Sequence, residues 1–286
     1  MAALTERQKN KMRIELSSQK SEMALNKGQM KEVCEAAAKL GVHTLKLVGK
    51  DPLSYSGLAG LVRELKKINN IWEVSLTTDG FGLAEQAKKL AVSGLDRVNI
   101  NIDTFKYMKY GKGNLDDVVA GINAATDAGL KPVKLNVVMK KEYNDDELMD
   151  FVQLTFQHQY EIRFIEMTEE EEACSCYKAM LCAEIKEKLP VLRPAIVDDE
   201  KNILDDPRDG TADVYKYPGA RGKICFIAKR AEDFASRCAG LYLTKDGILK
   251  QEQNDDGGVD LLPFLQERNA EKLEDIIRSV LGETEA

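Results

Sequence analysis

The first 166 residues repeat one pattern, in which a short apolar run is followed by a longer stretch with apolar residues at helical spacing. Six runs predict strands, at residues 12–16, 44–48, 73–77, 97–102, 132–139 and 161–166. The stretches between them predict helices, at residues 27–40, 56–68, 83–93, 115–128 and 145–158. Strands that alternate with helices in this way are typical of a parallel sheet.

Three glycines support this register. Gly41, Gly94 and Gly129 each follow a predicted helix and precede a predicted strand, where a left-handed helix cap is favoured. Because the βα units have near-equal length and no long crossover, they favour a partial barrel. The periodicity by itself also allows a doubly wound sheet.

The pattern changes after Glu166. Residues 168–173 are acidic and show no clear preference, residues 178–188 predict a helix, and residues 190–262 contain short strands broken by Asp, Pro and Gly. An amphipathic helix at residues 270–281 closes the chain. We therefore expect an α/β fold, with a partial (β/α)6 TIM-like barrel at residues 1–168 and an α+β C-terminal extension at residues 169–286.

Composition excludes several classes of protein. The net charge is -7 and no long run of Lys and Arg occurs, which argues against a nucleic-acid or anionic-membrane partner. No stretch approaches the roughly 18 apolar residues of a membrane span, and residues 1–11 lack the apolar core of a signal peptide. We expect a cytoplasmic protein whose six cysteines are reduced thiols.

Polar residues at the carboxyl ends of the predicted strands are candidates for a functional site, because an α/β barrel binds its ligands there. They are Arg13, Gly49, Lys50, Asp51, Thr77, Thr78, Asp79, Gly80, Asn101, Asp103, Lys134, Asn136, Arg163 and Glu166. Arg13, Lys134 and Arg163 stand within apolar strands, where a charge needs a partner. One interpretation is salt bridging inside the barrel, for instance of Arg163 with Glu166 or Asp103. The other is a phosphate-bearing ligand, which three cations in one mouth favour.

Histidine and cysteine offer little for a metal site or for nucleophilic catalysis. His43 and His158 are the two histidines, and we expect both to be structural. Cys174 and Cys176, with Cys182 beyond them, lack the CxxC spacing that thiolate metal sites commonly use. No metal site is expected.

Several runs resemble one enzyme family. LKLVGKDPL (45–53), SLTTDG (75–80), LDRVNINIDTF (95–105), PVKLNVVMKKEYNDDEL (132–148), EIRFIEM (161–167) and GKICFIAKRAEDFASRCAGLYLTKDGILKQ (222–251) resemble the GTP 3',8-cyclases, radical S-adenosylmethionine enzymes that start molybdenum cofactor biosynthesis. The resemblance implies a partial TIM barrel with a C-terminal extension over its mouth, usually as a homodimer. It also implies two [4Fe–4S] clusters, S-adenosylmethionine and GTP.

The cluster cysteines of the family are missing. Family members carry CxxxCxxC after the first strand, whereas this chain runs from Leu16 through Ser17 and Ser18 directly into a helix that contains Cys34. In the second cluster region only Cys238 remains, with Ala235 and Glu252 at the other two positions. Because one thiolate cannot hold a cubane cluster, no cofactor is expected in this chain.

Residues implied in GTP recognition are partly kept. Three family positions that follow the middle cysteine are changed, to Ala239, Gly240 and Tyr242. The resemblance implies a substrate-binding role for Arg13, Lys46, Thr78, Lys134 and Arg163, where Lys46 replaces an arginine. It implies contact with S-adenosylmethionine at Gly49, Lys50, Asn101 and Met167, where Lys50 replaces a glycine and Asn101 a serine.

Three hypotheses follow. We favour a degenerate GTP 3',8-cyclase that cannot run the radical reaction and binds GTP or a related nucleotide, alone or as the inactive partner of an intact paralogue. A second hypothesis is a non-radical enzyme on the same scaffold, in which Lys134, Arg163 and nearby carboxylates act on a phosphorylated substrate, with or without Mg²⁺. A third is a defective copy whose polar residues merely satisfy one another.

Overall fold

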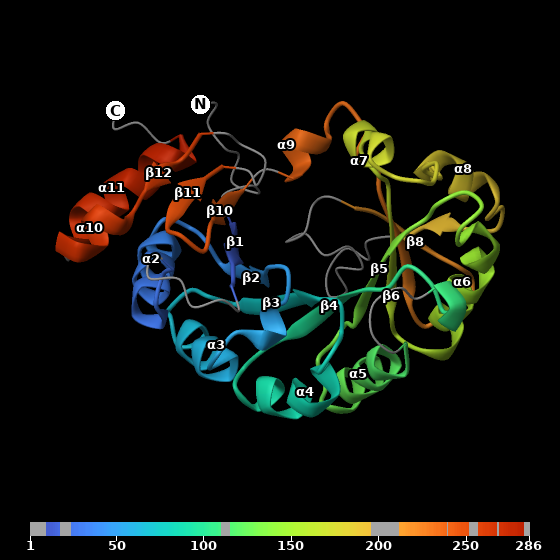
Figure 1. The fold of residues 1–286 in the computed structure, drawn as a ribbon, viewed down its shortest axis with the longest axis horizontal. Coiled ribbons are helices and arrows are strands. Elements are labelled where there is room, and N and C mark those ends of the chain that lie inside the picture. Colours follow the sequence, from blue (N-terminus) through green and yellow to red (C-terminus); the bar gives the residue numbers. More distant parts are fainter. Residues whose placement is uncertain are drawn as a thin grey trace.

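The computed structural model describes residues 10–17, 24–109, 115–195, 212–238, 240–251, 257–267 and 269–282. In these residues a curved sheet contains twelve strands in the order β12-β11-β10-β1-β2-β3-β4-β5-β6-β9-β8-β7. Figure 1 shows the sheet as an open crescent with helices on its convex side. The arrangement is a partial barrel, so the doubly wound alternative is excluded.

The strands β1 to β6 run parallel in sequence order. Their bounds are β1 Lys11–Glu15, β2 Thr44–Val48, β3 Glu73–Thr78, β4 Arg97–Asn101, β5 Lys134–Val138 and β6 Glu161–Ile165. The helices that cross between them are α2 Lys27–Lys39, α3 Leu58–Lys66, α4 Leu83–Val92, α5 Leu115–Asp127 and α6 Leu148–Gln157. Each predicted strand and helix is therefore present, with ends that differ by a few residues at most.

The C-terminal segment extends the sheet at both edges. On one side β9 (Lys223–Ile227) lies parallel to β6, followed by β8 (Asp213–Lys216) and β7 (Arg193–Pro194). On the other side β10 (Leu241–Leu243) lies parallel to β1, followed by β11 (Ile248–Lys250) and β12 (Val259–Asp260).

Five further helices lie in the described part of this segment: α7 Glu169–Ala173, α8 Cys182–Glu187, α9 Phe234–Cys238, α10 Leu262–Glu267 and α11 Ala270–Leu281. Figure 1 places α9 between the two arms of the crescent. From there the side chain of Arg237 reaches Asp213 at 3.0 Å, and its carbonyl oxygen accepts a hydrogen bond from Lys11. A residue of α9 thus contacts both arms of the open sheet.

The acidic segment that gave no clear prediction forms α7. The side-chain oxygen of Thr168 accepts a hydrogen bond from the backbone N–H of Glu171, and the Glu171 carboxylate accepts one from the N–H of Thr168. This reciprocal pair is a capping box, which satisfies the unpaired donors at the start of a helix.

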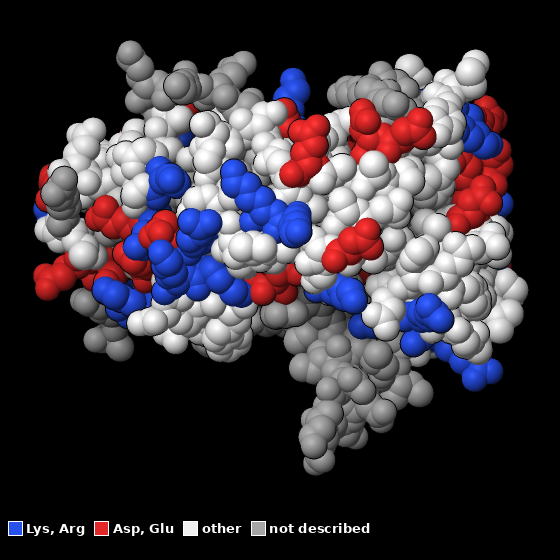
Figure 2. Space-filling view, turned by 90° about the horizontal axis from the view of Figure 1, so that it is seen from below, with Lys and Arg blue, Asp and Glu red and all other residues white. Residues whose placement is uncertain are grey.

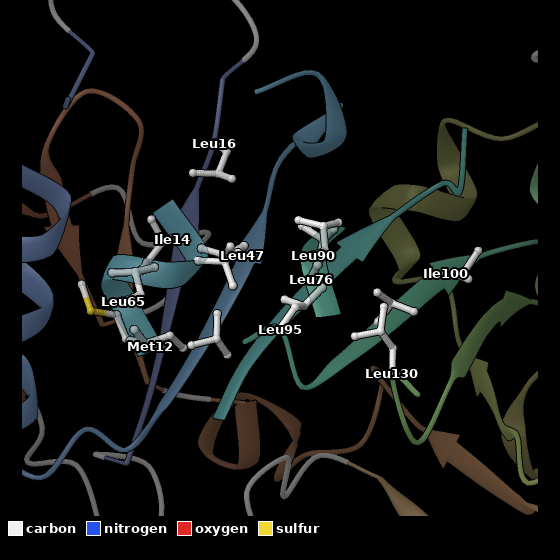
Figure 3. Packing of buried hydrophobic residues seen from close by; sticks show 14 of the residues in the cluster. Met12, Ile14, Leu16, Leu47, Leu65, Leu76, Leu90, Leu95, Ile100 and Leu130 are labelled. Carbon is white, nitrogen blue, oxygen red and sulfur yellow. The ribbon is translucent and has the colours of Figure 1, made fainter. Parts of the chain in front are cut away.

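The core lies between the sheet and the outer helices. Met12, Ile14, Leu47, Leu76 and Ile100 point from the strands toward the helical side, as Figure 3 shows. They meet a layer from the helices and their following turns, which includes Leu65, Leu90, Leu95 and Leu130. Burying such side chains stabilises the fold by about 1.5–3 kcal/mol each.

Three glycine corners adopt the expected backbone conformation. Gly41, Gly94 and Gly129 have φ angles of 92°, 99° and 79°. Because a side chain strongly disfavours this left-handed region, each glycine lets a helix end and turn directly into the next strand.

Candidate functional site

The inner face of the sheet is mostly polar along β1 to β6. Alternation along the strands gives one apolar face, toward the helices, and one face that carries six cations against three carboxylates. These charged residues are Lys11, Arg13, Lys46, Arg97, Lys134, Arg163, Glu15, Glu73 and Glu161. Parallel strands are usually apolar on both faces. An excess of cations inside a chain of net charge -7 favours an anionic ligand.

Lys134 and Arg163 share one carboxylate. Glu161 lies 3.1 Å from Nζ of Lys134 and 3.4 Å from Nε of Arg163, and all three side chains are buried. Burial and the charge of Glu161 also raise the pKa of the Cys225 thiol on β9 well above its usual value. The sequence singled out both cations, but it proposed Glu166 or Asp103 as the partner of Arg163.

Those two carboxylates have other contacts. Glu166 accepts hydrogen bonds from the backbone N–H groups of Cys182, at 2.7 Å, and Arg230, at 3.3 Å. Asp103 accepts one from Nζ of Lys140, at 2.9 Å. They therefore hold the segments at the carboxyl ends of the strands.

A second buried network was missed by the sequence interpretation. Nε and Nη2 of Arg97 lie 3.1 and 2.9 Å from the Glu73 carboxylate, and Nη1 donates to Oδ1 of Asn99 at 2.6 Å. The amide of Asn99 in turn donates to Thr77. The sequence did contain a signal for this network. Side chains alternate between the two faces of a strand, and these residues fall on the same face as the candidates named from the sequence.

Arg13 and Lys46 lie beside each other on β1 and β2, at the edge of the six-stranded part that β10 extends. They line a cavity of about 20 Å³ together with Ser75 and Arg97. The guanidinium of Arg13 donates to the carbonyl oxygen and to Sγ of Cys238, both at 3.2 Å. Cys238 thus lies in contact with Arg13, which the sequence analysis named as a candidate substrate residue.

Two asparagines meet near the barrel mouth. Nδ2 of Asn136 donates to Oδ1 of Asn101 at 2.9 Å, whereas Oδ1 of Asn136 is buried with no hydrogen-bond partner among the described residues. A buried acceptor without a partner is costly. The Asn136 side chain therefore offers an acceptor to a ligand.

The remaining expected site residues are distributed differently. Thr78 follows Leu76 on the helical side by strand alternation, and its hydroxyl oxygen accepts from the N–H of Gly80 at 3.1 Å. It is Thr77 that belongs to the inner face. Lys50 is exposed, and Met167 is buried with its carbonyl bound by Arg230.

Gly49 has a packing reason to be glycine. Its φ angle is 149°, and a Cβ atom at this position would lie 2.4 Å from the carbonyl oxygen of Leu16. The close approach of β1 and β2 at their carboxyl ends therefore accounts for this glycine without any ligand.

The NDDEL run (144–148) has a structural role. Nδ2 of Asn144 donates to the carbonyl oxygens of Asp103 and Val138, at 2.6 and 3.0 Å. Glu147 accepts from the hydroxyl of Thr104 and from the N–H of Phe105, at 2.6 and 2.7 Å. Both side chains are buried. They fix the segment that leaves β4 against the segment that leaves β5.

The cysteines do not come together. Cys174 and Cys176 are exposed, whereas Cys34, Cys182 and Cys225 are buried. Burial raises the pKa of the Cys182 thiol to about 12. In the described part of the chain, no group of three or more His, Cys, Asp or Glu side chains could hold a metal ion.

The histidines contribute to packing. His43 stacks on Trp72 with ring centroids 3.9 Å apart, and its Nδ1 contacts the carbonyl oxygen of Asn70 at 2.8 Å. His158 stacks on Tyr160.

Ala239 and Glu252, two of the positions that the resemblance marks as changed, lie outside the described residues. No described helix is long and apolar enough to span a membrane.

The outer helices carry a different kind of charged surface. Figure 2 views the molecule from the side of α4 and α5 and shows Lys and Arg side chains interspersed with Asp and Glu. Near the end of α3, Lys67 pairs with Glu64 at 2.9 Å and Lys66 with Asp96 at 2.6 Å. Local pairs of this kind are typical of a solvated helical surface.

Comparisons with known proteins agree with this arrangement. Residues 11–155 match the Radical SAM superfamily. The GTP 3',8-cyclase of Peptoclostridium acidaminophilum is 36% identical over 241 residues, which cover 82% of this chain and 71% of the relative. That of Moorella thermoacetica is 38% identical over 234 residues, with 80% and 71% covered.

A solved structure shares the fold. The crystal structure of Streptococcus suis SuiB bound to S-adenosylmethionine matches with a TM-score of 0.59 at 11% identity, covering 88% of this chain and 61% of that one. At this identity the likeness shows the fold alone. From the sequence relatives and the superfamily match together, the chain belongs to the GTP 3',8-cyclase family of the Radical SAM superfamily.

Proposed function

We propose that this chain binds a purine nucleotide, GTP by analogy with its relatives, on the inner face of the sheet, and that it does so without radical chemistry. The proposal of a nucleotide site rests on one observation: the inner face of β1 to β6 has six cations but only three carboxylates. A phosphate chain would offset the repulsion among these cations.

The donor set does not fit the family's clusters. Residues 17–25 read SSQKSEMAL, which contains no cysteine, and the next cysteine along the chain, Cys34, is buried in α2. Ala235 and Glu252 replace two of three thiolates in the second region, and the third, Cys238, is bound by Arg13. Because a cubane cluster needs several thiolates, neither cysteine set supports one. No step of the proposed function uses a cluster.

The chain's own residues suggest how a nucleotide is held. Arg13 and Lys46 are less buried than Lys134 and Arg163, so they are the first cations that an incoming phosphate chain would meet. Glu161 fixes the deeper pair at 3.1 and 3.4 Å and balances part of its charge when no ligand is bound. The open acceptor of Asn136 suits a ribose hydroxyl or a base amino group.

Calorimetric titration with GTP tests the binding half of the proposal. We expect GTP to bind and to raise the melting temperature by mass action. Lys46→Gln should weaken binding by roughly tenfold, because it removes one charge that faces the phosphates. Lys88→Gln on the outer surface of α4 is the matched control and should bind as the parent chain does. Absence of GTP binding, or equal loss in both variants, would overturn the site.

Anaerobic reconstitution with iron and sulfide tests the other half. The expected result is no stoichiometric iron and no cluster absorption band in the visible spectrum. Stoichiometric uptake of a cluster would contradict the proposal that radical chemistry is absent, and it would leave the nucleotide site untouched. The two halves of the proposal can therefore fail separately.

A further inference from the structure

The segment that contains α9 lies across the open side of the crescent (Figure 1). We call residues 231–238 the strap. Just before it, Nε of Arg230 donates to the carbonyl oxygen of Met167, beyond β6, at 2.9 Å. Just after it, the N–H of Gly240 donates to the carbonyl oxygen of Gln251, beside β10 and β11, at 3.0 Å. The two ends of the strap are therefore fixed to the sheet, one near each arm.

Polar contacts, and not a hydrophobic core, hold the strap in place. None of the side chains described in residues 231–238 is buried, and Phe234 is partly exposed. Arg237 connects the strap to Asp213 at 3.0 Å through side chains that are 27% and 44% exposed. Partly exposed ion pairs of this kind contribute little stability. The strap can therefore leave the sheet without unfolding the core.

The carboxyl end of the strap occupies two cations of the inner face. The guanidinium of Arg13 donates from Nη1 to the carbonyl oxygen of Cys238 and from Nη2 to its Sγ, both at 3.2 Å. Nζ of Lys11 donates to the carbonyl oxygen of Arg237 at 3.3 Å. The strap thus presents two acceptors to one guanidinium, which is also how a phosphate group binds arginine.

Phosphate oxygens are the stronger acceptors for these cations. A carbonyl oxygen carries no net charge and a cysteine sulfur is a weak acceptor, whereas a phosphate oxygen is ionised. The cavity that Arg13 and Lys46 line measures about 20 Å³, which is room for about one water molecule. A phosphate group needs more space beside these cations, and release of Cys238 from Arg13 provides it.

We propose that the strap is an autoinhibitory element, which competes with the phosphates of the nucleotide for Arg13 and Lys11. This inference rests on the proposed function, because it assigns a regulator to the same site. A phosphate that binds Arg13 displaces Cys238 and releases the strap. Conversely, the docked strap lowers the apparent affinity for the nucleotide, because only molecules with a released strap can bind it.

Two substitutions of opposite charge, each followed by calorimetric titration with GTP, test the competition. Arg237→Gln and Asp213→Asn break the same contact from its two sides, and neither residue belongs to the cations proposed to bind GTP. Both variants should bind GTP about twofold to fivefold more tightly than the parent chain does. An effect of charge alone would have opposite signs in the two variants. Lys88→Gln is the control and should bind as the parent chain does.

Amide hydrogen exchange measures the reciprocal effect of GTP on the strap. Saturating GTP should speed exchange over residues 234–238 by about fivefold or more and leave exchange in α4 unchanged. Slower exchange over 234–238, with weaker GTP binding by both variants, would show that the strap closes over the nucleotide, and the inference would be wrong. Opposite shifts of affinity in the two variants also overturn it.

The inference and the proposed function can fail separately. If the parent chain binds GTP and neither variant binds it more tightly, the nucleotide site stands and the strap is not autoinhibitory. If the parent chain does not bind GTP, the nucleotide site fails and the inference about the strap fails with it.

Discussion

The guanidinium of Arg13, on β1, donates to both the carbonyl oxygen and the sulfur of Cys238, at the end of α9, although 225 residues separate them. On the neighbouring inward position of β1, Nζ of Lys11 contacts the carbonyl oxygen of Arg237 at 3.3 Å. Two cations of the inner face therefore hold α9 between the arms of the crescent. Cys238 thereby takes part in a contact between side chains.

The Arg13 contact predicts the local stability of α9. Arg13→Gln should lower the stability of this helix by about 1 kcal/mol, since a part-buried, charge-assisted contact is lost. Amide hydrogen exchange over 234–238 should then speed up roughly fivefold, with little change in α4. The exposed variant Lys89→Gln is the control. Unchanged exchange in α9 would show that Arg13 does not anchor it.

Removing one partner of the buried Arg97–Glu73 pair should cost much stability. Arg97→Met removes the guanidinium that pairs with the buried Glu73 carboxylate, which should lower the free energy of unfolding by about 3–5 kcal/mol. Adding Glu73→Gln should restore part of that loss, because the uncompensated charge is removed. Urea unfolding of the three variants measures both effects. A double variant no more stable than Arg97→Met would contradict this explanation.

The buried carboxylate of Glu147 should contribute to the stability of the fold. Glu147→Gln keeps the shape of the side chain but replaces one acceptor oxygen by a donor, next to the hydroxyl of Thr104 and the N–H of Phe105. We expect a loss of about 1–3 kcal/mol in unfolding free energy. Asp150→Asn, an exposed change on α6, serves as the comparison and should be nearly neutral. Thermal unfolding at several urea concentrations distinguishes the two.

Thiol labelling should divide the cysteines by burial. In the native protein at mildly alkaline pH, Cys174 and Cys176 should react first with an alkylating reagent. Cys182 and Cys225 should react only on unfolding, because burial raises their pKa values, that of Cys182 to about 12. Peptide mass spectrometry identifies the labelled sites, and the same reaction in urea should label all six cysteines. Fast native labelling of Cys225 would show that the β6 and β9 pairing opens readily.

The contact between Glu172 and Arg230, near the carboxyl end of β6, should depend on pH. The hydrogen bond from Arg230 holds the pKa of Glu172 below its ordinary value of 4.5. Since the folded value is the lower one, this pair contributes stability above pH 4.5 and loses it as the pH falls through the folded value. NMR titration of the Glu172 carboxyl carbon measures the value. Arg230→Gln should return it toward the ordinary one, and Lys178→Gln, a more distant and exposed cation, should change it much less.

Local sequence was sufficient for the repeating elements. The apolar periodicity predicted β1 to β6 and α2 to α6, because each depends on the spacing of residues within one short segment. It did not predict α7, whose start rests on a capping box between Thr168 and Glu171 in a segment with no apolar pattern. Nor did it show that β9 and β10 join the sheet, since strand pairing links residues far apart in the chain.

The candidate site divides in the same way. The sequence by itself determined that cations such as Lys134 and Arg163 occur within apolar strands, and that residues 17–33 contain no cysteine. Only the tertiary structure decided that these two cations share Glu161. Composition and spacing are properties of the chain itself. The partner of a buried charge is set by strand register and sheet curvature, which bring distant segments together and which no local pattern encodes.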